Sequence, residues 1–293
     1  MKRTTEWIIE KLIFISGIGS IVFVALIFFF LLKEGLSLFA SVNVFSFLFG
    51  VNWYPISEPP QFGILPLILG SLLVTLGAVV IAVPLGIASA LYVAEVAPKW
   101  LSEILKSGIE LLAAIPSIVL GFIGIATLAP FLKNVFNLPS GLTALAGSIM
   151  LAFMAMPTIV SIIEDSINSV PRSYREGSLA LGATRWQTIY RVILPAASSG
   201  ILAAIMLGIG RVIGETMAVL MITGNAAILP TSILQPVRTL TATIAAEMGE
   251  AVSGSEHYFA LFAIGIVLFV ISFIINLVAD FFMNRNKKRN KKK

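Results

Sequence analysis

The chain has 293 residues, of which 58% are hydrophobic and 12% are charged, and it carries a formal net charge of +5. Together with a mean hydropathy of +0.98, this composition excludes a soluble globular protein and indicates an integral membrane protein. The lack of cysteine excludes disulfides and thiolate metal sites. The positive charge does not indicate nucleic-acid binding, because the basic residues cluster at the ends of apolar segments. Lysine and arginine at these positions set the orientation of a membrane protein.

Six apolar segments are long enough to cross a hydrocarbon core of about 30 Å as helices. They are residues 12–32, 64–94, 111–132, 141–163, 192–222 and 258–279. The first is longer than a signal-peptide core and is not followed by a small-x-small cleavage pattern, so we interpret it as a retained span. The second and fifth exceed one straight span, and Pro66, Pro84 and Pro195 are candidate positions for a bend.

The lysine and arginine residues predict that both termini are cytoplasmic. If the N-terminus is inside, sixteen of them fall in cytoplasmic segments, and only Lys33, Lys133 and Arg238 fall in outside loops. The first outside loop, residues 33–62, is apolar and aromatic and is expected to lie in the interface or pack on neighbouring spans. We interpret the basic C-terminal run as a topology anchor attracted to anionic lipid.

The long polar interruption in the second half of the chain covers residues 171–195. Ser173 with Glu176 fits the S-x-x-E capping box, and Thr184 with Gln187 fits its T-x-x-Q form, with a glycine between the two. The pattern predicts a short helix, a glycine turn and a second helix that continues into the fifth apolar segment.

One face of the first predicted helix is small and apolar. Tyr174, Gly177, Ser178 and Leu181 follow at helical spacing, just before the turn glycine Gly182. Three arginines flank this face: Arg172, Arg175 and Arg185. Such a face is typical of a helix that docks into a partner's groove, and a solvated loop lying on lipid headgroups is the alternative.

Two ionisable residues, Arg211 and Glu215, lie inside the fifth apolar segment in GIGRVIGETMAV. A charge at the bilayer centre costs about 2.5–3.5 kcal/mol on insertion scales, so both need an explanation. At i and i+4 they are expected to share a helix face and pair. A guanidinium suits an oxyanion, and a carboxylate accepts a hydrogen bond from a phosphate hydroxyl. The pair, with the adjacent Thr216, is therefore either a polar station on an anion path or a structural ion pair.

Other ionisable residues are expected to carry no chemistry. Glu95 and Glu110 are interpreted as boundary residues at span ends, and Glu164 and Asp165 as solvated. His257, the single histidine, has no neighbouring metal ligand in the sequence. The chain lacks both G-x-x-x-x-G-K-[ST] and H-E-x-x-H, so we expect no ATP site, catalytic residue, cofactor or metal site.

The spacing of Glu176, Gly182, Val192, Leu194 and Pro195 resembles the EAA loop of ABC-transporter permeases, E-A-A-x3-G-x9-I-x-L-P. A glycine and a serine replace the two alanines, and a valine replaces the isoleucine. The stretches REGSLALGATRWQTIYRVILPAASSGI and GRVIGETMAVLMITGN resemble the phosphate-importer permeases, more closely the PstC type than the PstA type.

The resemblance implies an all-α integral membrane protein with the type I ABC importer permease fold. That fold has six transmembrane helices, with a cytoplasmic coupling helix between the fourth and fifth. The implied division is a first span with its outside loop (1–62), a permease core (63–283) containing a coupling loop (164–191), and a basic cytoplasmic tail (284–293). The implied location is a prokaryotic cytoplasmic membrane.

The resemblance also implies the function, an ATP-driven import of inorganic phosphate. The implied partners are a PstA-type permease in a heterodimer, two cytoplasmic ATPase subunits, an extracytoplasmic phosphate-binding protein and membrane lipid, without nucleic acid. It assigns coupling to the ATPase to Ser173, Tyr174, Glu176, Gly177, Ser178, Leu181 and Gly182. It assigns the substrate pathway to Arg211, Glu215 and Thr216. Sulfate, molybdate or tungstate as substrate, and an autonomous secondary transporter, remain alternatives.

Overall fold

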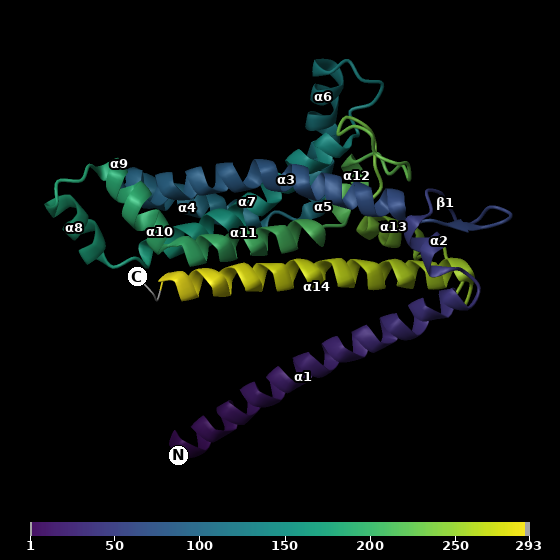
Figure 1. Ribbon diagram of the computed structural model, residues 1–293, viewed down its shortest axis with the longest axis horizontal. Coiled ribbons are helices and arrows are strands. Elements are labelled where there is room, and N and C mark those ends of the chain that lie inside the picture. The colour runs from purple at the N-terminus through teal and green to yellow at the C-terminus, as the bar shows by residue number, and fades with distance from the viewer. Residues whose placement is uncertain (1, 291–293) are drawn as a thin grey trace.

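The structure is a computed structural model that describes residues 2–290. Long helices run side by side through most of the molecule (Figure 1). A hairpin of α8 (Arg172–Ala180) and α9 (Arg185–Thr188) lies at one end of the bundle. The antiparallel strands β1 (Trp53–Tyr54) and β2 (Gln61–Phe62) lie at the opposite end. The last three residues of the predicted basic tail, 291–293, fall outside the described range.

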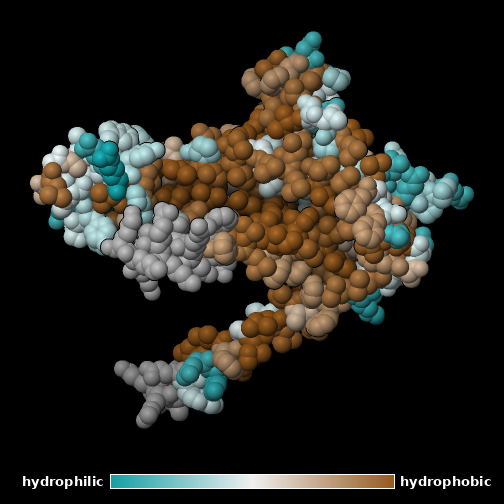
Figure 2. Space-filling view, viewed as in Figure 1, coloured by the Kyte–Doolittle hydropathy of each residue, from teal (hydrophilic) through white to brown (hydrophobic). Residues whose placement is uncertain are grey.

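Among the described residues, five helical segments are long and apolar enough to cross a membrane, and a bent helix pair adds a sixth. The five are Ile9–Ala40, Leu65–Val96, Ser117–Val135, Ala144–Asn168 and Glu256–Val278. The bent pair, Arg185–Ala196 and Ser198–Ile213, meets at 69°. Figure 2 shows apolar surface over the spans and hydrophilic residues over the α8–α9 hairpin and the β1–β2 hairpin. The expected six apolar segments are therefore present in a multi-pass arrangement.

The core of the bundle is α7 (Ala144–Asn168), which is the most buried span and packs against α3 (Leu65–Leu91) and α11 (Ser198–Ile213). Buried small residues recur along α3 at every fourth position: Ala78, Ala82, Gly86 and Ala90. A Cβ placed on Gly86 would lie 2.7 Å from Cγ2 of Ile159 on α7. Small residues let helix backbones approach closely, which is how helices associate in lipid.

The first helix, α1 (Lys2–Ser37), leaves the bundle at a wide angle, and its second half contacts α14 (Glu256–Asn290). The contact includes an edge-to-face pair of rings, Phe30 and Phe262, with centroids 5.4 Å apart. In Figure 1, α1 begins and α14 ends toward the same end of the molecule as the α8–α9 hairpin.

The third span begins at Ser117 and not at residue 111, where the prediction of a span over 111–132 placed its start. The chain forms α4 (Lys99–Ala114), breaks at Pro116, and continues as α5 (Ser117–Ile123), a π-helical turn and α6 (Ala129–Val135). The break occurs because proline disfavours helical geometry in the residue before it, and Ile115 is extended with ψ 126°.

The fifth apolar segment is also divided. After α9, a π-helical turn and the short α10 (Leu194–Ala196) lead to the sharp bend before α11. A second break follows α11, and α12 (Met217–Ile222) completes the segment. Of the three prolines proposed as bend positions, Pro195 lies two residues before this bend, whereas Pro84 lies within the continuous α3.

The loop that was predicted to lie outside, residues 33–62, packs on the helix ends, as expected. It contains α2 (Val44–Phe49), and the side chains of Phe47 and Trp53 are buried. The indole of Trp53 donates to both carboxylate oxygens of Glu247, at 3.2 and 3.0 Å, on α13 (Leu240–Glu247). Nε2 of His257 lies 2.9 Å from the same carboxylate. The loop is thus tied to the start of α14 through one acidic side chain.

Candidate functional site

The α8–α9 hairpin, residues 171–188, has the predicted form of helix, glycine turn and helix. Gly182 ends α8 in the left-handed region with φ +85°. The capping box at α9 is present: Gln187 N donates to Thr184 Oγ1 at 3.3 Å, and Thr184 N donates to Gln187 Oε1 at 2.9 Å. Local sequence signals therefore predict this hairpin correctly.

The predicted capping box of Ser173 and Glu176 is wrong. The N-cap of α8 is Pro171, and Ser173 makes no side-chain cap because it already lies inside the helix. Proline has the φ angle of a helix start, so the helix begins earlier than the serine signal suggests. The carboxylate of Glu176 is left exposed and makes no ion pair within the described part of the chain.

The predicted face of α8 is largely exposed. Tyr174 and Leu181 are 54% and 90% exposed, and no atom lies within 4 Å of a Cβ built on Gly177. Ser178 departs from this face, since its Oγ lies 3.0 Å from Oγ1 of Thr188 on the other arm of the hairpin. The exposed face is therefore formed by Tyr174, Gly177 and Leu181, with Ser178 bracing the hairpin from inside.

Substitution of Gly182 by alanine is expected to loosen the hairpin. Space is available around Gly182, but an L-residue in the left-handed region costs about 1–2 kcal/mol. Backbone amides of 178–183 should exchange with deuterium roughly five- to thirtyfold faster by mass spectrometry. Gly177→Ala is the matched control, because Gly177 is helical and unobstructed; equal exchange in both variants would contradict this explanation.

Arg175 fastens the hairpin to two spans. Its Nε and Nη2 donate to Oε1 of Glu95 at 3.1 and 2.6 Å, and its Nη1 and Nη2 donate to the carbonyls of Val170 and Ile167 at 2.8 and 3.0 Å. Nη2 of Arg185 donates to the backbone carbonyl of Glu95 at 3.1 Å. Glu95 lies at the end of a span, as predicted, but it also pairs with the hairpin, which the sequence did not predict. No local pattern reveals this contact, because its partners lie 80 and 90 residues away.

A second ion pair lies near the same end of α7. Glu164 is buried and accepts from Nζ of Lys106 at 2.9 Å and from Nδ2 of Asn168 at 2.7 Å. The prediction that Glu164 is solvated is therefore wrong, whereas Asp165 is exposed as predicted. The hydrogen bond and negative charge of Glu164 raise the pKa of Lys106 above its ordinary value.

The predicted pair of Arg211 and Glu215 does not form. Nη1 of Arg211 donates to Oγ1 of Thr158 on α7 at 3.0 Å, and Oε1 of Glu215 accepts from the backbone N–H of Ala218 at 3.2 Å. The helix α11 ends at Ile213, so the i, i+4 geometry that the prediction assumed is absent. Glu215 instead caps the beginning of α12.

The break between α11 and α12 is held by two hydroxyl groups. Oγ1 of Thr216 donates to the carbonyl of Gly214 at 3.2 Å, and Oγ1 of Thr241 donates to the carbonyl of Glu215 at 2.9 Å. These bonds satisfy backbone groups that the interrupted helix leaves without partners. The guanidinium of Arg211 remains exposed beside this break.

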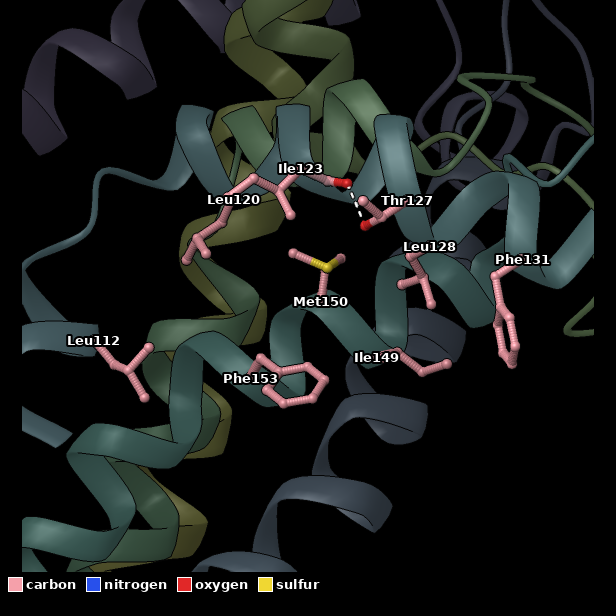
Figure 3. Close-up of a pocket in the computed structure, with 9 residues that line it drawn as sticks. All are labelled: Leu112, Leu120, Ile123, Thr127, Leu128, Phe131, Ile149, Met150 and Phe153. Atoms are coloured by element: carbon pink, nitrogen blue, oxygen red, sulfur yellow. Dashed lines mark hydrogen bonds between the residues drawn. The ribbon is translucent and has the colours of Figure 1, made fainter. Parts of the chain in front are cut away.

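An apolar groove of about 520 Å³ lies between α7 and the broken third segment. In Figure 3, Met150 and Phe153 from α7 face Leu120 and Ile123 across it. Thr127 also lines the groove, and its hydroxyl group donates to the carbonyl of Ile123 at 2.7 Å. None of the residues that line the groove is charged. The exposed guanidinium of Arg211 is therefore the better candidate for an anion-binding group.

Residues 82–289 match the family of binding-protein-dependent transport system inner membrane components, and the chain belongs to this family as an ABC-transporter permease of the PstC type. It is 44% identical to the probable ABC transporter permease protein YqgH of Bacillus subtilis over 260 residues, covering 88% of this chain and 84% of that protein. It is 38% identical to the phosphate transport system permease protein PstC of Mesorhizobium japonicum, covering 82% and 79% of the two chains.

Solved structures share the type I permease fold. A chain of a bacterial alginate ABC transporter, solved with its pentasaccharide-bound periplasmic protein, superposes with a TM-score of 0.70 at 16% identity, covering 96% of each chain. A chain of the inward-facing methionine transporter MetNI gives a TM-score of 0.60 at 18% identity, covering 74% of this chain and 93% of that one. The predicted fold class is thereby confirmed.

Proposed function

We propose that this chain is the membrane-spanning subunit of an ATP-driven importer of inorganic phosphate. The resemblance to PstC proteins supports phosphate as the substrate, since several proteins of that name are 33–38% identical to the chain. The observation that carries the proposal is the exposed guanidinium of Arg211 beside a helix break inside an apolar bundle.

An exposed arginine in a spanning segment does not face lipid without a large cost, so water or another subunit covers it. Thr158 is a neutral partner and engages one N–H of the guanidinium. The remaining N–H groups are available to a tetrahedral oxyanion, which a guanidinium binds in a bidentate manner. Glu215 and Thr216 lie beside it at the break, where backbone rearrangement is easiest.

The α8–α9 hairpin is the proposed contact with a separate ATPase, through Ser173, Tyr174, Glu176, Gly177, Ser178, Leu181 and Gly182. Exposed apolar side chains flanked by arginines suit a groove on a soluble partner. If the hairpin is cytoplasmic, sixteen of the lysines and arginines lie on the cytoplasmic side of the membrane. Cytoplasmic loops are enriched in these residues, so the count supports a cytoplasmic hairpin and cytoplasmic termini.

The proposed assembly pairs this permease with a homologous PstA-type permease, two ATPase subunits and an extracytoplasmic phosphate-binding protein. Nucleotide binding closes the ATPase pair and displaces the hairpin as a lever. The spans on either side then rock, and the pathway near Arg211 changes from outward to inward access.

The test is ATP hydrolysis by the assembled complex in vesicles, with binding protein loaded with phosphate or with sulfate. Stimulation by the phosphate-loaded form alone supports the proposal. Equal or greater stimulation by sulfate would assign another oxyanion, and uptake into vesicles that contain this chain alone would indicate an autonomous secondary transporter.

A further inference from the structure

Every hydrogen bond between the described residues of the hairpin and the end of α3 converges on Glu95. Two N–H groups of Arg175 donate to one carboxylate oxygen, and Arg185 donates to the backbone carbonyl of the same residue. The Arg175 and Glu95 side chains are 22% and 14% exposed, so water competes little for this bond.

Glu95 lies in the π-helical turn Tyr92–Val96 that extends α3. The N–H of Ala97 donates to the carbonyl of Tyr92 at 2.8 Å, which closes the wide turn. Such turns interrupt the regular ladder of a helix and are often found at functional positions. The helix α3, which precedes this turn, packs along α7 and α11 in the core of the bundle.

The same arginine holds the end of α7 in a different way. Its bonds to the carbonyls of Ile167 and Val170 are to neutral acceptors, whereas its bond to Glu95 joins two opposite charges. All four bonds are charge-assisted through the guanidinium, but only the two to Glu95 add the attraction of an opposite charge on the acceptor. A displacement of α8 therefore acts on α3 through one strong contact.

We propose that Glu95 is a positioning residue that transmits movement of the α8–α9 hairpin to α3. It receives the movement through Arg175 and, at its backbone, through Arg185. This inference rests on the proposed function, because it assumes that an ATPase moves the hairpin. It adds the route by which that movement enters the bundle.

The test uses the complete complex in vesicles and measures phosphate uptake per ATP hydrolysed. Glu95→Gln keeps a hydrogen-bonding group but removes the charge, and we expect uptake per ATP to fall about tenfold, within the usual range of coupling between sites. Hydrolysis and co-purification of the ATPase should persist. Glu95→Asp keeps the charge and should restore part of the ratio.

Lys106→Gln is the matched control. It removes the ion pairs of Lys106 with Glu164 and Asp165 near the end of α7, and neither pair includes a residue of the hairpin. Its uptake per ATP should equal that of the wild type. An equal loss in Lys106→Gln and Glu95→Gln would overturn the inference, because general loosening of this end would then explain both.

A wild-type ratio in Glu95→Gln would overturn this inference and leave the proposed function standing. A wild-type complex without ATP-driven uptake would overturn both. If the Glu95→Gln complex does not assemble, uptake per ATP is measured on Arg185→Gln, because Arg185 is exposed and donates to the carbonyl of Glu95. This variant should lower uptake per ATP by a smaller factor. An unchanged ratio would overturn the inference.

Discussion

Glu176→Lys is expected to abolish transport while the chain still inserts in the membrane. The exposed carboxylate of Glu176 lies on α8 among several arginines, without an ion pair in the described chain. In the proposed contact, this carboxylate is the acidic group of the hairpin that a basic residue of the ATPase would bind. Loss of one member of a charge pair in an interface costs about 2–5 kcal/mol, and reversal of the sign adds repulsion. ATP-driven uptake should fall to background, and the ATPase should no longer co-purify.

Glu103→Lys is the matched control for this variant. Glu103 is an exposed glutamate on α4 outside the hairpin, so its reversal should leave uptake and co-purification near wild type. Normal uptake by Glu176→Lys would show that the carboxylate of Glu176 takes no part in the proposed contact with the ATPase.

Arg211→Gln is expected to lower phosphate flux by about tenfold to a hundredfold with the complex still assembled. The substitution removes a charged donor, and a hydrogen bond to a charged group contributes about 1.5–3 kcal/mol. Glutamine can still bond to Thr158, so the packing of α11 on α7 should survive. Radiolabelled phosphate uptake at several concentrations measures the effect.

Two further variants separate charge from geometry at this position. Arg211→Lys keeps the charge but loses the planar fork, and it should recover only part of the flux. Arg191→Gln neutralises an exposed arginine near the hairpin and should leave phosphate affinity unchanged. Unchanged flux in Arg211→Gln would mean that the arginine has only a structural role.

Short-range signals in the sequence predict the hairpin well. The capping box of Thr184 and the left-handed Gly182 each depend on neighbouring residues, and both are confirmed. The number of apolar segments is also predictable, because hydropathy depends on composition alone. Assignments of particular residues to coupling and to the substrate pathway stay predictions.

The errors arise where one local signal overrides another or where distant segments meet. Pro171 starts α8 before Ser173, and the end of α11 separates Glu215 from Arg211. The burial of Glu164 depends on Lys106, which lies 58 residues away, and the role of Glu95 depends on Arg175. Sequence periodicity contains no information on such contacts before the fold is known.

Disulfide crosslinking of the hairpin to the ATPase tests the central claim most directly. The chain has no native cysteine, so Leu181→Cys places a single thiol at a position that is 90% exposed on the hairpin. Val252→Cys, 75% exposed at the opposite end, is the control. With cysteines placed along the ATPase surface, we expect a crosslink from Leu181→Cys and none from Val252→Cys. Absence of any crosslink from Leu181→Cys in the intact, assembled complex would contradict the account.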